Sequence, residues 1–256
     1  MEPTADSSDP PVFKYWAFIS YSHSDQRWSN WLFSALETYR VPKRFVGKDT
    51  GTGPVPIRLF PLFRDRDELP TSADLGANIR NALQESRFLI VICSPRAAKS
   101  KWVNEEILGF KRLGRGNHIL PIIVEGEPNA ADGKPGFDIL EECLPPALRF
   151  RLGNDGHISE HRHEPICADV RKNADGKLRG KIKLISGLIG VSFDELWQRE
   201  KIRLRNFLWT IAGFFFLAIT VAGGLIYKAD RESRRAAEGD IQRQNAEAER
   251  DAAAHV

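Results

Sequence analysis

Apolar and polar positions along the first half of the chain predict strands and helices in alternation. The run YWAFISY at residues 15–21 is almost unbroken in apolar and aromatic character, which is typical of a strand buried on both faces of a parallel sheet. Apolar side chains then recur at i, i+3, i+4 and i+7, which predicts an amphipathic helix over residues 24–40 with Ser24 as its N-cap. Together they form a first βα unit.

The alternation continues along the chain. It predicts strands at 57–60, 87–93 and 118–124, a helix at 75–84 and another that begins near residue 99 and ends near residue 114. Residues 125–163 predict a long loop with a short helical piece near 140–150, before a weak last strand at 164–170 and a helix at 178–189. We therefore expect an α/β fold, a flavodoxin-like parallel sheet with helices on both faces.

One apolar segment, FLWTIAGFFFLAITVAGGLIY at residues 207–227, departs from this pattern because it carries no charge over its whole length. At about 1.5 Å per residue, a helix of this length spans roughly 30 Å, the thickness of a bilayer's hydrocarbon core. We expect a single transmembrane helix with Trp209 and Tyr227 at the interfaces, the alternative being a buried central helix. Basic residues flank both ends, so the positive-inside rule does not decide the orientation.

The remaining segments are polar. Residues 1–12 predict a disordered leader, and residues 228–256 predict an Ala-, Glu- and Arg-rich tail that is either a solvent-exposed helix or disordered, without a heptad seam. Residues 191–205 predict a helix that leads into the apolar segment. Three widely spaced cysteines and an acidic, polar start without a secretory signal favour a reducing compartment.

Composition narrows the function only slightly. Charged residues are 28% and hydrophobic ones 42%, and a net charge of +3 is too small to indicate nucleic acid as a partner. Neither a Gly-rich phosphate loop nor a dinucleotide fingerprint occurs in the sequence. The residues His157, His161, His163 and Cys167 do not have the spacing of a structural zinc site, so we expect no metal.

Polar loops follow the predicted strands at the edge where parallel sheets bind ligands. These loops are SYSHSD, FRDRDELP and SPRAAKSKW, and each leads into a helix. Helix N-termini favour phosphate groups, so a nucleotide would find anion-binding groups at this edge.

Two adjacent glutamates lie on the helix that follows the third loop. At about 100° per residue, Val103, Ile107 and Phe110 form the stripe that packs on the sheet. Glu105 then points to solvent, whereas Glu106 lies roughly 60–80° from the centre of the stripe, with Trp102 as its i−4 neighbour. A carboxylate at this margin is either aimed into a crevice or merely half-exposed.

Four motifs in succession, FISYSHSD, LFRDRDELPTSADL, SKWVNEE and HILPIIV, resemble the Toll/interleukin-1 receptor (TIR) domain. The resemblance covers residues 13–200 and is strongest to bacterial TIR proteins that carry a membrane helix after the domain. The pattern W-x-x-x-E, here Trp102 to Glu106, marks the branch of the family that cleaves NAD.

The resemblance implies cleavage of NAD at the nicotinamide–ribose bond, giving nicotinamide and ADP-ribose or a cyclic isomer, with NAD as the substrate and no cofactor. It makes Glu106 the catalytic residue, because a preplaced carboxylate stabilises the oxocarbenium-like ribosyl cation. Trp102 is then a wall of the pocket or a packing residue. The residues implied on the nucleotide side are Phe18, Ser20, Tyr21 and Ser22, with sheet core as the alternative for Phe18.

Family members bind NAD between neighbouring TIR domains, which implies a homo-oligomer. The RD-rich loop resembles the family's BB loop and is the expected assembly loop, the alternative being a solvated, self-paired loop; it comprises Arg64, Asp65, Arg66, Asp67, Glu68 and Leu69. A non-catalytic adaptor that acts by homotypic TIR association is the second hypothesis for the chain. A phosphoacceptor receiver is excluded because the third strand ends in Cys93 rather than aspartate. Since NAD is an intracellular metabolite, we expect the domain in the cytoplasm and the helix across the cell (inner) membrane.

Overall fold

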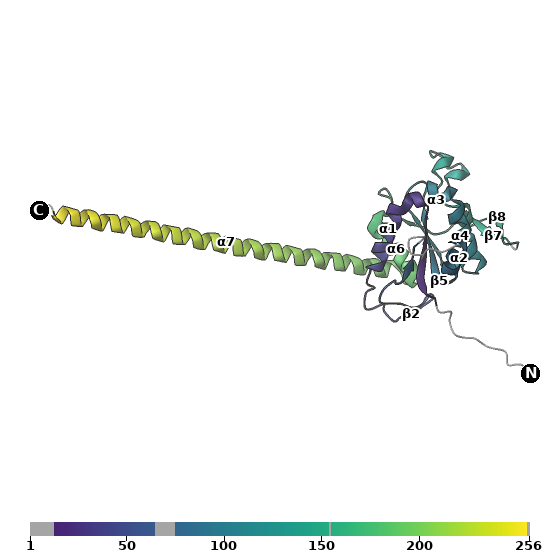
Figure 1. The fold of residues 1–256 in the computed structure, drawn as a ribbon, viewed down its shortest axis with the longest axis horizontal. Helices are drawn as coiled ribbons and strands as arrows, with labels where there is room; N and C mark the ends of the chain where they lie inside the picture. Colours follow the sequence, from purple (N-terminus) through teal and green to yellow (C-terminus); the bar gives the residue numbers. More distant parts are fainter. Residues whose placement is uncertain (1–12, 65–74, 154, 255–256) are drawn as a thin grey trace, which may run out of the picture. The chain divides into compact units, whose positions relative to one another are not determined.

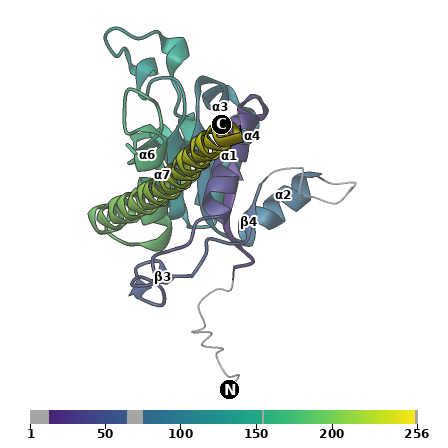
Figure 2. The same ribbon diagram turned by 90° about the vertical axis from the view of Figure 1, so that its left-hand side faces the viewer.

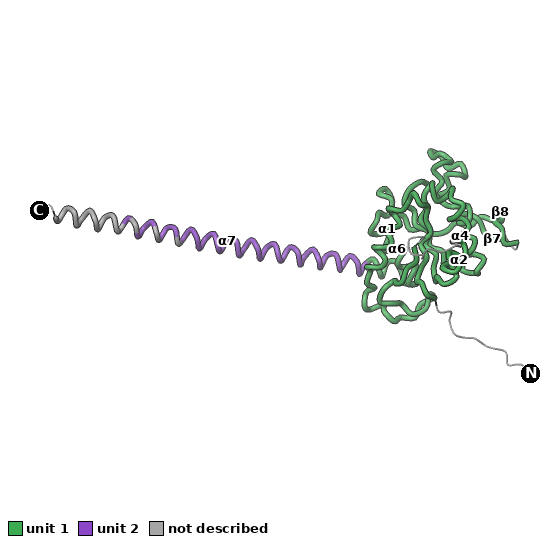
Figure 3. Tube along the Cα trace, in the orientation of Figure 1, with its two compact units in different colours: residues 1–197 green, residues 198–256 purple. Residues whose placement is uncertain are grey.

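The computed structural model describes residues 13–64, 75–153 and 155–254. The chain divides into two compact units, Met1–Trp197 and Gln198–Val256, which Figure 3 distinguishes by colour. The first unit holds the sheet and its covering helices. The second unit belongs to one long helix.

Parallel strands form the sheet of the first unit in the order β4-β1-β5-β6-β9. The strands are β1 (Tyr15–Ser20), β4 (Leu62–Phe63), β5 (Ser86–Cys93), β6 (Ile119–Ile123) and β9 (Ala168–Asp169). Counted along the chain, these strands lie in the order second, first, third, fourth, fifth, which is the flavodoxin-like order. The predicted fold class is confirmed.

Helices cover both faces of this sheet, because alternate residues of each strand point to opposite sides (Figure 1). Ala17 and Ile19 of β1 join one buried cluster, with α1 (Gln26–Glu37) and α6 (Gly176–Ile189). Phe18 joins the cluster on the other face, with α2 (Leu75–Gln84) and α4 (Lys101–Arg112). In Figure 2 the face carrying α1 and α6 is turned toward the viewer.

Short elements join these larger ones. They are the 3-10 helices η1 (His23–Asp25), η3 (Gly116–His118), η4 (Ala130–Asp132) and η5 (Ile139–Glu141), the helices α3 (Pro95–Lys99) and α5 (Pro146–Arg149), the antiparallel pair β2 (Asp49–Thr50) and β3 (Gly53–Pro54), and the antiparallel pair β7 (Phe150–Leu152) and β8 (Ile158–Arg162). The last pair lies where the sequence predicts a loop. The strand β8 is mostly exposed, so it shows no apolar alternation by which the sequence could have indicated it.

Two local predictions are wrong. The strand predicted at residues 57–60 is β4 at Leu62–Phe63 instead, because those two residues pair with Ala17 and Phe18 of β1. The apolar pattern does not distinguish two neighbouring apolar runs, and the sheet register selects the second. Ser24 is not a helix cap either, since it lies inside η1 and α1 begins after Asp25.

The helix α7 (Phe193–Ala254) includes the predicted apolar segment and most of the tail. It contains a stretch, Phe193–Gly239, that by length and composition is able to cross a membrane, with a mean hydropathy of 2.0 over its most apolar window. None of that window is buried in the protein. Phe214, Phe215 and Phe216 are all exposed.

Candidate active site

The helix α4 presents its two glutamates in different environments, as its periodicity predicts. Ser100 is the N-cap, and its hydroxyl accepts a hydrogen bond from the backbone N–H of Val103 at 3.4 Å. Glu105 is exposed and lies 3.7 Å from Arg112. Glu106 is half-buried beside the stripe that packs on the sheet. The amphipathic pattern of α4 therefore separates the two carboxylates.

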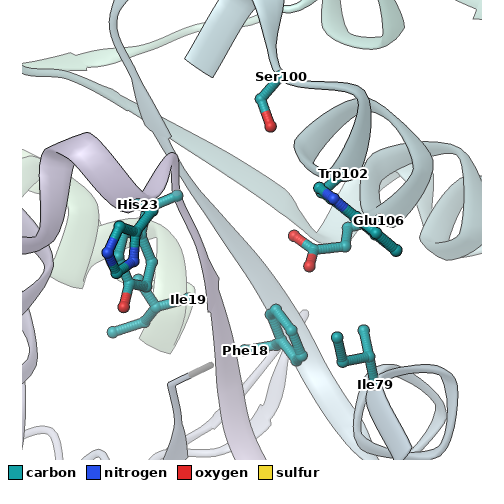
Figure 4. Close-up of a pocket in the computed structure, with 8 residues that line it drawn as sticks. Phe18, Ile19, His23, Ile79, Ser100, Trp102 and Glu106 are labelled. Carbon is teal, nitrogen blue, oxygen red and sulfur yellow. The ribbon is translucent and has the colours of Figure 1, made fainter. Parts of the chain in front are cut away.

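Glu106 opens onto a cavity of about 120 Å³ between β1, α2 and α4, which we call the Glu106 cavity (Figure 4). Figure 4 shows the carboxylate pointing into the cavity, with the Trp102 indole beside it and Phe18 and Ile79 below it. The residues that line the cavity are Phe18, Ile19, Tyr21, His23, Ile79, Ser100, Trp102 and Glu106.

A serine at the end of the first strand holds the Glu106 carboxylate. The hydroxyl of Ser20 donates a hydrogen bond to Oε2 of Glu106 at 2.5 Å. Ser20 is 1% exposed and lies in register with Val91 of β5, so the sheet fixes its backbone. A hydrogen bond from a hydroxyl to a carboxylate is charge-assisted, so it orients the Glu106 side chain strongly.

The structure brings together most of the residues that the sequence places on the nucleotide side. Phe18, Tyr21 and Trp102 line the Glu106 cavity, and Trp102 is 61% exposed, so it is a wall of the cavity rather than a packing residue. Phe18 fits both interpretations, the nucleotide side and the sheet core. It lines the cavity and is also buried against Phe63, with the two ring centres 5.0 Å apart. Ser22 does not line the cavity, and its carbonyl accepts the N–H of Asp25 at 2.7 Å.

The predicted assembly loop falls largely outside the described residues, which include Arg64 but not Asp65, Arg66, Asp67, Glu68 or Leu69. Arg64 contacts α1, where its guanidinium donates to the side-chain oxygen of Asn30 and lies 4.8 Å from the ring centre of Phe33. The alternative of a solvated loop whose own charges pair with one another therefore lies outside the described residues.

Sequence reasoning missed four residues that line the cavity, namely Ile19, His23, Ile79 and Ser100. His23 belongs to the SYSHSD loop, whose position at a strand end is the signal that could have identified it. Ser100 lies two residues before the tryptophan of the W-x-x-x-E pattern and caps its helix. Nothing in the sequence indicates Ile79, because its place depends on how α2 packs against α4.

An ion cluster connects the loops that follow three strands; it consists of the buried Asp25 and Ser94, the partly buried Arg96 and the exposed Glu125. Arg96 donates to Asp25 at 2.6 Å and to Glu125 at 2.6 Å, and the hydroxyl of Ser94 donates to Asp25 at 2.5 Å. The hydrogen bond from Arg96 holds the pKa of Glu125 below its usual range. These residues follow β1, β5 and β6, so the cluster fixes three strand ends relative to one another.

Within the described ranges, no group of three or more His, Cys, Asp and Glu side chains has an arrangement suited to a metal ion. Cys93, Cys143 and Cys167 are all free thiols, and the first two are fully buried.

Residues 17–143 match the family model of the TIR domain. Among curated proteins, the chain is similar to the NAD(+) hydrolase ApTIR of Actinoplanes sp., with 31% identity over 250 residues that cover 94% of this chain and 32% of the relative. It is also similar to a putative disease resistance protein of Arabidopsis thaliana, with 28% identity over 142 residues that cover 54% of this chain and 11% of the relative. The chain thus spans about a third or less of these relatives.

Two solved structures are also similar, each at 22% identity. The TIR domains of the activated Roq1 resistosome match 47% of this chain and 63% of theirs, with a TM-score of 0.34. The TIR domain of the Toll-related receptor TRR-2 from Hydra magnipapillata matches 49% of this chain and 84% of its own, with a TM-score of 0.31.

Proposed function

Because this chain belongs to the TIR domain family, we propose that it is an NAD nucleosidase that cleaves the nicotinamide–ribose bond, with Glu106 as the catalytic residue. The observation that carries the proposal is the Glu106 carboxylate, which is half-buried at the mouth of a cavity and held by Ser20 at 2.5 Å. The 31% identity to a protein named an NAD(+) hydrolase supports the same reaction.

The chemistry requires one negative charge near one sugar carbon. When the C–N bond breaks, its electron pair leaves with nicotinamide, which becomes neutral, and the ribose carries an oxocarbenium-like positive charge. The Glu106 carboxylate stabilises that charge because it is already in place and partly shielded from water. Water then adds to the sugar and loses a proton, which gives ADP-ribose; attack by a nitrogen of the adenine ring gives a cyclic isomer.

Cavity size supports a site that a second copy of the domain completes. The Glu106 cavity is about 120 Å³, whereas sites that enclose a whole small molecule are about 300–1,000 Å³. It is therefore too small to enclose the whole dinucleotide, and in our proposal it receives only the part of NAD that reacts at Glu106. We place the remaining contacts on a neighbouring TIR domain, with the loop that starts at Arg64 as the assembly loop of a homo-oligomer.

We further place the apolar part of α7, residues 207–227, across a membrane with the TIR domain on the cytoplasmic side. The exposed phenylalanines of this segment support the placement, since large apolar side chains without protein contacts favour lipid. Cytoplasmic NAD would then reach the domain directly.

The decisive assay follows nicotinamide release from NAD by the full chain reconstituted in vesicles at increasing surface density. Glu106→Gln removes the charge and keeps the shape, so we expect its rate to fall by about 100-fold or more. Glu105→Gln is the matched control, because Glu105 is the adjacent residue of the same helix and is exposed; its rate should stay within about twofold.

Each other outcome of this assay rejects a specific part of the proposal. If the wild type releases no nicotinamide at any density, the enzyme hypothesis is wrong and the adaptor hypothesis replaces it. If Glu106→Gln retains full activity, the reaction stands but its assignment to Glu106 is wrong.

A further inference from the structure

A second cavity, which we call the tryptophan cavity, lies at the carboxyl ends of β6 and β9. Its volume is about 730 Å³, within the range of about 300–1,000 Å³ typical of small-molecule sites. In the described part of the chain it shares no lining residue with the Glu106 cavity. Parallel sheets bind ligands beyond the carboxyl ends of their strands, so the location is itself typical of a binding site.

Two tryptophans of α1 form the aromatic wall of this cavity. The rings of Trp28 and Trp31 meet edge to face with their centres 5.8 Å apart. Both pack partly against the buried core and are half-buried, so each indole keeps surface that borders the cavity. Phe137 lines the cavity as well. Indole surfaces of this kind stack planar heterocycles, and such stacking tolerates any nucleobase.

Besides Arg171, which is paired with Glu127 and Asp169, three cationic side chains line the same cavity, namely Arg27, Lys172 and Lys177. The ammonium group of Lys177 lies 4.9 Å from the ring centre of Trp28 and 5.4 Å from that of Trp31. Within the described chain none of the three cations forms an ion pair. An anion bound to Lys177 would therefore lie next to the aromatic wall.

The acidic residues of the cavity do not cancel these charges. Glu125 is bonded to Arg96 at 2.6 Å, and Glu127 is bonded to Arg171 at 2.7 Å and also to Lys134. Both carboxylates are thus paired with cations other than the three described above, although Arg96 is shared with Asp25 and Arg171 with Asp169. A third carboxylate, Glu141, is engaged by the backbone N–H of Asp138 at 3.2 Å. The three cations therefore give the cavity positive charge that a bound anion can contact.

We propose that the tryptophan cavity binds a nucleotide, that is, a planar base carrying one or more phosphate groups. Because the two indole planes are nearly perpendicular, the base stacks on one indole and meets the other at an angle, and the phosphates contact Lys177, Lys172 and Arg27. The N-terminus of α6 at Gly176 also lines the cavity, and the backbone N–H groups of a first helical turn add to phosphate binding. This assignment does not depend on NAD cleavage, because no residue of the Glu106 cavity takes part.

Titration calorimetry of the full chain in detergent with ADP tests the proposal. ADP lacks the nicotinamide–ribose bond, so an NAD nucleosidase does not consume it. We expect saturable binding of ADP, at least about tenfold weaker binding of adenosine and of pyrophosphate, and affinity that decreases with added salt. Absence of ADP binding at concentrations of about 5 mM would overturn the proposal.

Variants locate the binding within the molecule. Trp28→Ala removes one stacking surface and should weaken ADP binding by about tenfold. The pair Lys172→Gln and Lys177→Gln changes two exposed side chains, so it leaves the core intact should Trp28→Ala fail to fold, and it should weaken binding by about tenfold or more. Trp102→Ala, in the wall of the Glu106 cavity, is the matched aromatic control and should change the affinity by less than about twofold.

Two results contradict the assignment. If the lysine pair leaves the ADP affinity within about twofold of the wild type, phosphate does not bind in this cavity. If Trp102→Ala abolishes ADP binding while the lysine pair does not, ADP occupies the Glu106 cavity instead.

Discussion

The hydroxyl of Ser20, the last residue of β1, donates a hydrogen bond of 2.5 Å to Glu106 on α4, across 86 positions of the sequence. The donor is fixed by the central sheet, and the acceptor is fixed by a helix whose apolar stripe packs on that sheet. The orientation of the carboxylate is therefore determined by two rigid elements rather than by a loop.

Ser20→Ala should reduce the rate of NAD cleavage by about tenfold, with little change in KM, because the carboxylate loses a charge-assisted hydrogen bond that orients it. The matched control is Ser86→Ala, which removes another buried serine hydroxyl, one that donates to the carbonyl of Ala82 at 2.7 Å. Steady-state kinetics of both variants check this. An equal loss of rate in both would mean that the effect is structural and not specific to Glu106.

Asp25 and Arg96 should show strong energetic coupling, because Asp25 is buried and bonded to Arg96 at 2.6 Å. In a double-mutant cycle with Asp25→Asn and Arg96→Gln, we expect a coupling free energy of about 1–3 kcal/mol. The exposed pair Glu105 and Arg112 is the control and should couple by less than about 0.5 kcal/mol. Urea unfolding of a chain that ends at residue 200 measures both; similar coupling in the two pairs would contradict the prediction.

His118 should make folding stability fall on acidification. Burial lowers its pKa, and the nearby Arg87 and Arg115 lower it further. Since the folded pKa is below the unfolded value of about 6.5, the unfolded chain binds more protons, so stability is full above about pH 6.5 and decreases as the pH falls through the folded pKa. His118→Phe keeps the ring that packs 5.2 Å from Phe88 and removes the titration.

Urea unfolding at neutral and mildly acidic pH measures this effect. The loss of stability between the two pH values should be smaller in His118→Phe than in the wild type, but not zero, because burial lowers the pKa of His163 in the same way. The exposed His157→Gln is the control and should behave like the wild type. A pH dependence unchanged in His118→Phe would exclude His118 as its source.

The native thiols should be unreactive at neutral pH. Burial raises the pKa of Cys93 and of Cys143, and it raises the pKa of Cys167 to about 12. Because the thiolate is the reactive form, an aromatic disulfide reagent should titrate none of them rapidly in the folded protein. All 3 cysteines of the sequence should react in denaturant. A fast-reacting thiol in the folded protein would disagree with the burial described for these residues.

Arg64→Ala should reduce NAD cleavage more at low surface density in vesicles than at high density, if the loop that starts there closes the site of a neighbouring copy. Dilution lowers the occupancy of a weakened assembly, and crowding restores it. Arg112→Ala is the control, since that arginine is exposed and is the last residue of α4. A loss of activity that is the same at every density would contradict a role in assembly.

Much of the fold can be predicted from the sequence because the signals are local. The predicted helix at residues 75–84 is α2 with the same bounds, and the predicted strands at 87–93 and 118–124 are β5 and β6. Periodicity also predicts correctly that Glu105 is more exposed than Glu106, because the angle between each residue and the apolar stripe of the helix determines its exposure.

Other features depend on contacts between distant segments, which no local pattern encodes. The sheet register places β4 at Leu62–Phe63 rather than at residues 57–60, and Asp25 bonds to Arg96 instead of capping α1. The tryptophan cavity forms because β6 and β9 end, and α1 and α6 begin, at the same edge of the sheet.

By itself, the sequence determined the order of strands and helices, the apolar segment at residues 207–227 and the choice of Glu106 over Glu105. Only the tertiary structure decided that Ser20 bonds to Glu106 and that Trp102 is a wall of the cavity. The physical reason is that hydrophobic periodicity fixes which face of an element is buried, whereas a hydrogen bond across the sheet requires the relative position of two elements.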